Sequence, residues 1–119
     1  MSDIKVEPFI PDEDYDNPAM VTDFYELTMM QGFFLEHHNP RVVFDMFYRN
    51  NPFNGGYTIF TGLEDLIEKL ENFRFSPEDI QYLRSLNKFQ PSFLEYLESY
   101  SFSGDLYAFD EGTPAFPQE

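Results

Sequence analysis

The chain has 119 residues, enough for one domain, and 42% of them are hydrophobic, including 15 Phe and 8 Tyr for a core. Its 22 acidic and 7 basic residues give a net charge of −15, which excludes binding to nucleic acid or an anionic membrane through a basic surface. Cysteine is absent, so there is no disulfide or thiolate metal site, and no apolar run approaches the roughly 20 residues of a membrane helix.

The first part of the chain differs in composition from the rest. Residues 1–18 are rich in Asp, Glu and Pro, which is typical of a flexible, extended lead-in. We therefore expect the folded domain to span residues 19–119. The first residues also lack the charged-then-apolar order of a signal peptide, which predicts a soluble, cytoplasmic protein.

A helix is predicted from about residue 23 to residue 37. Thr22 or Asp23 can cap its first turn, and Glu26 follows Asp23 at the spacing of a capping box. Nearly every side of this helix is apolar, so something must cover both of its faces. A chain of this size covers a second face with difficulty, and we expect a larger protein or a second subunit to do so. Tyr25, in the polar first turn, is the strongest candidate for a functional side chain, although a core position is the ordinary alternative.

The remaining elements are predicted in the order strand, strand, three helices and two strands. Strand patterns cover 41–48 and 57–61, which we expect to pair as an antiparallel hairpin across a Gly-containing loop. Helix patterns cover 63–71, a segment that starts at Ser76-Pro77, and 91–99; strand patterns cover 105–109 and 113–116. This order predicts an α+β domain with a largely antiparallel sheet and several short helices.

No catalytic or metal-binding constellation is recognisable among these residues. His37 and His38 are adjacent, so on a helix their side chains diverge by about 100° and do not form a metal pair. We expect them at a solvated helix end. The numerous carboxylates, such as Glu64 and Glu68, are typical of helix surfaces. The chain alone is therefore predicted to contain no catalytic residue, no metal site and no bound cofactor.

Arg49 is the most notable of the seven cations. It stands where a predicted strand ends and the loop Asn54-Gly55-Gly56 approaches. A guanidinium binds phosphate bidentately, and backbone N–H groups in glycine loops favour anions. The alternative is a salt bridge to one of the many nearby acids, and an isolated glycine pair is equally consistent with simple turn chemistry.

Several segments, taken together, are characteristic of one family. They are 22–29 (TDFYELTM), 47–57 (FYRNNPFNGGY), 60–64 (FTGLE), 71–75 (ENFRF), 82–86 (YLRSL) and 104–108 (GDLYA) with Glu111-Gly112. In this order, from about residue 17 to the end, they resemble the N-terminal part of nicotinate phosphoribosyltransferase.

The resemblance implies an enzyme of NAD salvage in the cytoplasm. It would join nicotinate to 5-phosphoribosyl-1-pyrophosphate, giving nicotinate mononucleotide and pyrophosphate, with ATP hydrolysis and Mg in the full-length enzyme. The family combines an N-terminal α/β-hammerhead-type domain with a C-terminal α/β barrel, and this chain lacks the barrel. The family's catalytic histidine lies in that barrel, so neither His37 nor His38 is assigned its role.

The resemblance also implies roles for three residues. Tyr25 matches a tyrosine that stacks on the pyridine ring in a neighbouring subunit's site, and Asp23 matches the acid beside it. Arg49 matches an arginine near the phosphates of the sugar donor, although the family more often has a lysine beside it, where this chain has Asn50 or Asn51. The chain would serve as a homodimer scaffold and partner-side wall of the pyridine site, inactive alone. A free-standing binding or regulatory module, or part of a related nicotinamide or quinolinate phosphoribosyltransferase, is the alternative.

Overall fold

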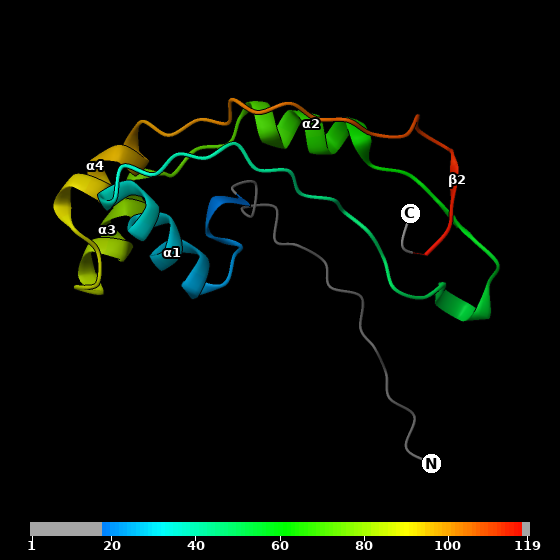
Figure 1. Cartoon of the computed structure of the whole chain (residues 1–119), viewed down its shortest axis with the longest axis horizontal. Coiled ribbons are helices and arrows are strands. Elements are labelled where there is room, and N and C mark those ends of the chain that lie inside the picture. Colours follow the sequence, from blue (N-terminus) through cyan, green and yellow to red (C-terminus); the bar gives the residue numbers. More distant parts are fainter. Residues whose placement is uncertain (1–17, 118–119) are drawn as a thin grey trace, which may run out of the picture.

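The computed structural model describes residues 18–117, so the predicted lead-in lies outside the described residues except for Pro18. The elements in chain order are η1 (Pro18–Met20), α1 (Phe24–Leu35), η2 (Pro52–Asn54), β1 (Thr58–Ile59), α2 (Leu63–Glu71), α3 (Pro77–Ser85), α4 (Pro91–Glu98) and β2 (Pro114–Ala115). Helices α1, α3 and α4 gather at one end, the helical end, and β2 lies at the other, the sheet end; α2 and long extended stretches connect them (Figure 1). The longest of the described helices, α1 with 12 residues, is too short to cross a bilayer, and no other described helix is a candidate span.

The hydrophobic core lies at the helical end. Phe93, Leu94 and Leu97 of α4 are at most 1% exposed and cluster with Ile80 and Leu83 of α3. Because these residues recur at spacings of three and four, each helix presents them on one face, and the two faces meet. The predicted helices at 63–71, from Pro77, and at 91–99 are thereby confirmed to within a residue or two.

Side-chain hydrogen bonds define how the helices at this end begin and connect. The Ser76 hydroxyl accepts the Asp79 N–H at 3.1 Å, and the Asp79 carboxylate accepts the Ser76 N–H at 2.8 Å. This capping box, with Pro77 in the first turn, starts α3 where the sequence predicts it. The amide of Gln31 on α1 donates to the carbonyl of Lys88 at 3.2 Å and accepts the N–H of Gln90 at 2.6 Å. Gln31 therefore attaches α1 to the connection between α3 and α4.

At the sheet end, β1 and β2 form a two-stranded antiparallel sheet in which Thr58 lies opposite Ala115. Phe60 extends the pairing by accepting the N–H of Gly112 at 2.8 Å and donating to the carbonyl of Thr113 at 2.9 Å. Gly112 has a φ of 86°, a left-handed conformation that glycine adopts without the strain of a Cβ. The chain therefore turns at this glycine just before β2.

Helix α2 begins with a cap that comes from a residue far along the chain. The carboxylate of Glu111 accepts the N–H of Gly62 at 2.7 Å and the N–H of Leu63 at 3.0 Å. A carboxylate at a helix N-terminus satisfies otherwise unpaired donors and complements the helix dipole. Because α2 has no fully buried residue, its stability depends strongly on this cap.

We expect Glu111→Ala to loosen α2. Loss of the cap should cost about 1–2 kcal/mol, which corresponds to roughly 5- to 30-fold faster amide hydrogen exchange in residues 63–71. Exchange followed by mass spectrometry measures this. Glu95→Ala removes an equal charge from the exposed face of α4 and should leave α2 unchanged. Equal exchange rates in α2 for the two variants would contradict the capping role.

The predicted hairpin between 41–48 and 57–61 is wrong. The described structure has no strand at 41–48 or at 105–109, and the only described strand pairing joins 58–59 to 114–115. Side-chain alternation shows that a segment suits a sheet, but a strand forms only where its backbone meets another edge. The α+β class is confirmed with four α-helices and one small antiparallel sheet among the described residues. A hammerhead-type domain and a missing barrel stay predictions.

Candidate functional site

The start of α1 places Tyr25 at the surface. Asp23 and Glu26 occupy the positions of a capping box, as predicted, and the Glu26 carboxylate accepts the N–H of Asp23 at 3.2 Å. It also accepts a hydrogen bond from the Thr22 hydroxyl. Tyr25 follows in the first turn with 58% of its surface exposed, and its ring stacks on no other described ring. The capped first turn of α1 thus holds the Tyr25 ring with more than half of the residue's surface exposed.

Helix α1 has one covered and one uncovered apolar face. Leu27 is buried, and Met30 and Phe34 pack against the same core. Met29 and Phe33 follow Tyr25 at four-residue intervals, and both are about half exposed. Residues four apart lie on the same side of a helix, so these three side chains form an apolar stripe that stays about half exposed, with the ring of His38 against Phe33 at its end. This agrees with the expectation that the described chain covers only one face of the helix.

Arg49 lies just before η2 and is exposed. It makes no ion pair with any residue in the part of the chain that the structure describes. The salt-bridge alternative for this residue therefore has no support among residues 18–117. In a chain with 22 acidic side chains, an exposed guanidinium without an ion pair to any described acid is a candidate to bind another anion.

The loop after Arg49 has a conformation that sequence reasoning missed. Phe53 and Asn54 take φ values of 57° and 52°, whereas Gly55 has a φ of −72° and donates its N–H to Pro52 at 3.0 Å. The left-handed positions are thus occupied by a phenylalanine and an asparagine, not by the glycines. Asparagine tolerates this region and could have indicated it, but no comparable signal marks Phe53. Phe53 is 100% exposed, so the loop projects a bare ring into solvent.

The three predicted site residues do not form a single site within the described chain. Tyr25 and Asp23 belong to the start of α1 at the helical end, and Arg49 precedes η2, beside the sheet end (Figure 1). If the three residues contact the same substrates, a second subunit or another part of the enzyme must bring them together.

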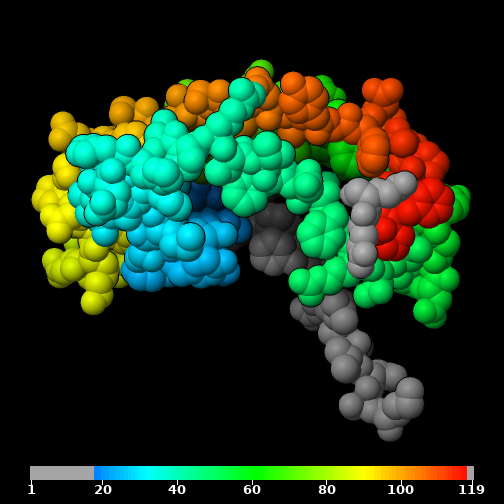
Figure 2. Space-filling view, in the orientation of Figure 1, coloured from blue at the N-terminus to red at the C-terminus, as the bar shows by residue number. Residues whose placement is uncertain are grey.

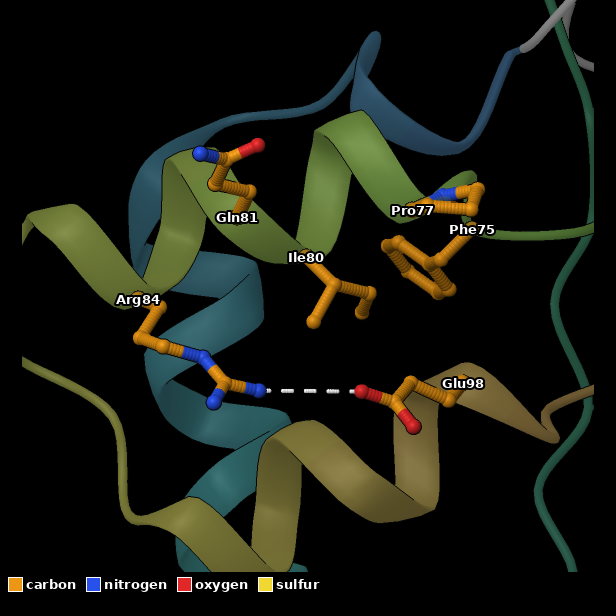
Figure 3. Close-up of a pocket in the computed structure, with 6 residues that line it drawn as sticks. All are labelled: Phe75, Pro77, Ile80, Gln81, Arg84 and Glu98. Carbon is orange, nitrogen blue, oxygen red and sulfur yellow. Dashed lines mark ion pairs between the residues drawn. The ribbon is translucent and has the colours of Figure 1, made fainter.

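A groove among the described residues lies elsewhere, between α3 and α4. It has a volume of about 610 Å³ and is lined by Phe75, Pro77, Ile80, Gln81, Arg84 and Glu98. In Figure 3 the Arg84 guanidinium faces the Glu98 carboxylate across the groove, at 3.6 Å. None of the predicted site residues lines it, and its one cation is already paired. We therefore do not take this groove as the functional site.

Three further side chains with possible chemical roles are the two histidines, which are exposed, and Tyr100, which packs against the core. His37 and His38 are both exposed at the end of α1, as predicted, and no group of three His, Cys, Asp or Glu in the described part of the chain could hold a metal ion. Burial, together with the neighbouring Tyr96, raises the pKa of Tyr100. A raised pKa keeps the phenol protonated at neutral pH, which suits a core residue and not a general base.

Comparison with known proteins places these observations in context. The family described as nicotinate phosphoribosyltransferase (NAPRTase) N-terminal domain matches residues 20–119. The chain is 43% identical over 101 residues to nicotinate phosphoribosyltransferase pncB2 of Mycobacterium tuberculosis, covering 85% of this chain and 22% of that protein. It is 42% identical over 103 residues to the nicotinate phosphoribosyltransferase of Caenorhabditis elegans (83% and 18%). It is 38% identical over 105 residues to that of Bacillus subtilis (87% and 21%). The chain thus spans about a fifth of the length of these relatives.

Proposed function

The chain belongs to the nicotinate phosphoribosyltransferase family as its N-terminal domain, and we propose that it forms the N-terminal part of an enzyme that joins nicotinate to 5-phosphoribosyl-1-pyrophosphate. The products are nicotinate mononucleotide and pyrophosphate, and the reaction consumes ATP in cytoplasmic NAD salvage. The relatives named above all carry the name nicotinate phosphoribosyltransferase, which favours nicotinate over nicotinamide or quinolinate as the pyridine substrate.

In this enzyme the chain acts as dimer scaffold and as the partner-side wall of the pyridine site. The observation that carries this role is the exposed Tyr25 on an uncovered apolar stripe of α1. In a head-to-tail homodimer, the stripe is covered by the neighbouring subunit, and the Tyr25 ring stacks on the pyridine ring bound there. Asp23 lies beside it, and Arg49 contacts the phosphates of the sugar donor.

The described residues do not fit the ATP and Mg of the full-length enzyme. Residues 18–117 contain no group of three potential ligands for a metal ion, and the sequence contains no glycine-lysine loop for a nucleotide triphosphate. We assign both to the remainder of the enzyme, together with the catalytic residues. The chain alone is therefore expected to have no turnover.

A chimera tests the proposed function. Residues 1–119 replace the matching N-terminal region of the Bacillus subtilis relative, and nicotinate mononucleotide is measured after addition of nicotinate, phosphoribosyl pyrophosphate, ATP and Mg²⁺. We expect product from the chimera and none from residues 1–119 alone. A folded chimera without activity would contradict the proposal, and binding of nicotinate by residues 1–119 alone would favour the free-standing module.

We expect Tyr25→Ala in the chimera to raise the KM for nicotinate. An aromatic pair contributes about 0.5–1.5 kcal/mol beyond its buried area, so KM should rise roughly 2- to 12-fold with kcat little changed. Steady-state kinetics with varied nicotinate measure this. Tyr25→Phe, which keeps the ring, should stay close to the unsubstituted KM. Tyr82→Ala removes a similarly exposed ring from α3 and should have no effect. An unchanged KM in Tyr25→Ala would contradict the stacking role.

A further inference from the structure

Segment 41–47 has the composition of a strand but pairs with no strand among the described residues. Its side chains Val43 and Phe44 are 86% and 88% exposed, and Val42, Met46 and Phe47 are exposed as well. The face formed by Val42, Phe44 and Met46 is therefore wholly apolar, which is typical of a strand with one covered face; the opposite face carries the charged Arg41 and Asp45 between apolar side chains. None of its backbone N–H or carbonyl groups bonds to another described residue. Figure 2 shows the segment at the surface, between the helical end and the sheet end.

A second extended segment, 105–109, has the same character. Tyr107 is 91% exposed, and Leu106 and Phe109 are nearly half exposed. Within the described chain, no backbone hydrogen bond from 105–109 reaches 41–47. Within residues 18–117, both segments thus present backbone groups without hydrogen-bond partners beside exposed apolar side chains, which is the usual feature of an unprotected sheet edge.

Two contacts define how these segments run relative to each other. The Arg41 guanidinium pairs with the Asp105 carboxylate at 3.2 Å, and the Tyr48 hydroxyl donates to the carbonyl of Ala115 at 2.7 Å. The first residues of the two segments are therefore linked, and so are Tyr48, which follows the first segment, and Ala115, which lies beyond the second. Both run from the helical end to the sheet end (Figure 1). The two segments run parallel without forming a ladder, so neither supplies hydrogen-bond partners for the backbone groups of the other.

We propose that 41–47 and 105–109 are two strands of an incomplete sheet, and that the strands completing it come from the same polypeptide beyond residue 119. This inference rests on the proposed function, because it requires a longer chain. About four-fifths of each relative lies outside the match to this chain, which covers 18–22% of them. A strand added to an open edge pairs its backbone groups, and its side chains pack beside the exposed apolar side chains of its neighbour.

Two other occupants are disfavoured by charge and composition. A second copy of these 119 residues would bring together two chains that each carry a net charge of −15. Residues 1–17 are also acidic, and Pro8 and Pro11 interrupt their longest apolar run. Proline cannot donate to a sheet ladder, so this segment is poorly suited to pair with 41–47.

Amide hydrogen exchange tests the proposal on residues 1–119 and on the chimera described above. In the isolated chain, peptides covering 41–47 and 105–109 should exchange without protection at every protein concentration. In the chimera we expect exchange slowed by at least about 100-fold, as for amides in a stable ladder. A peptide covering 91–98 should be protected in both samples, which confirms that the helices are folded.

Proline variants provide a second readout. Neighbouring amides of a strand point to opposite edges, so Val42→Pro or Val43→Pro must remove a ladder hydrogen bond if 41–47 is paired. At least one of them should destabilise the chimera, whereas neither should affect the isolated chain. Similar behaviour of both variants in the two proteins would argue against pairing in the chimera.

Each remaining outcome overturns the proposal in a distinct way. Unprotected segments in the chimera would exclude the added strands. Protection in the isolated chain that grows with concentration would identify a second copy as occupant. Protection independent of concentration and lost on deletion of residues 1–17 would identify that segment instead. Activity is measured on the same chimera, so an active enzyme with exposed segments would disprove the added strands and leave the proposed function intact.

Discussion

Phe93→Ala should lower the free energy of unfolding of the helical end by about 3–5 kcal/mol, the cost of removing a buried phenylalanine from a packed core. Phe93 is 0% exposed and lies within 6.3 Å, centroid to centroid, of the rings of Phe34, Phe89 and Tyr96. These rings come from α1, α4 and the connection before α4, so no single neighbour can move in to fill the cavity. Urea denaturation followed by circular dichroism at 222 nm measures the loss.

Phe53→Ala is the matched control for this variant. It removes the same atoms from a ring that is 100% exposed, so stability should change by less than about 0.5 kcal/mol. In both variants a phenylalanine is replaced within the same chain, and the difference between them isolates burial. A loss below about 1 kcal/mol for Phe93→Ala would show that α1, α3 and α4 do not form the cooperative core described above.

Arg49→Ala in the chimera should raise the KM for phosphoribosyl pyrophosphate by about 10- to 150-fold. Hydrogen bonds to charged groups contribute about 1.5–3 kcal/mol, and Arg49 has no competing ion pair among the described residues. The chain has only seven cations and a net charge of −15, so little other positive charge can compensate for its loss. Steady-state kinetics with varied phosphoribosyl pyrophosphate measure this.

Two variants separate a specific phosphate contact from a general effect of charge. Arg49→Lys keeps the charge but lacks the planar fork, so its KM should lie between those of Arg49→Ala and the unsubstituted chimera. Lys69→Ala removes a cation from α2 and should change the KM by less than about twofold. If Arg49→Ala and Lys69→Ala gave the same KM, the role of Arg49 would reduce to net charge, and its proposed contact would be wrong.

The amino-acid sequence alone determined the α-helices of this chain, whereas it left both an exposed and a core position open for Tyr25. The Ser76-Pro77 start of α3 and the capping box at Asp23 and Glu26 depend on residues within one turn, so local sequence is sufficient to predict them. The excess of apolar residues around α1 indicated a face that the described chain does not cover, and Tyr25 lies on that face. Its role in binding stays a prediction.

Only the tertiary structure decided which backbone groups meet over long distances in the chain. The pairing of 58–59 with 114–115 and the cap of α2 by Glu111 join residues about fifty positions apart, and neither pattern is visible in a local window. The same applies to 41–47, whose alternation favours a strand although no described edge pairs with it. Side-chain periodicity reports which faces of a segment are apolar, whereas strand formation requires a second backbone at the correct distance and direction. Which backbone lies beside a given segment is decided only when the chain folds.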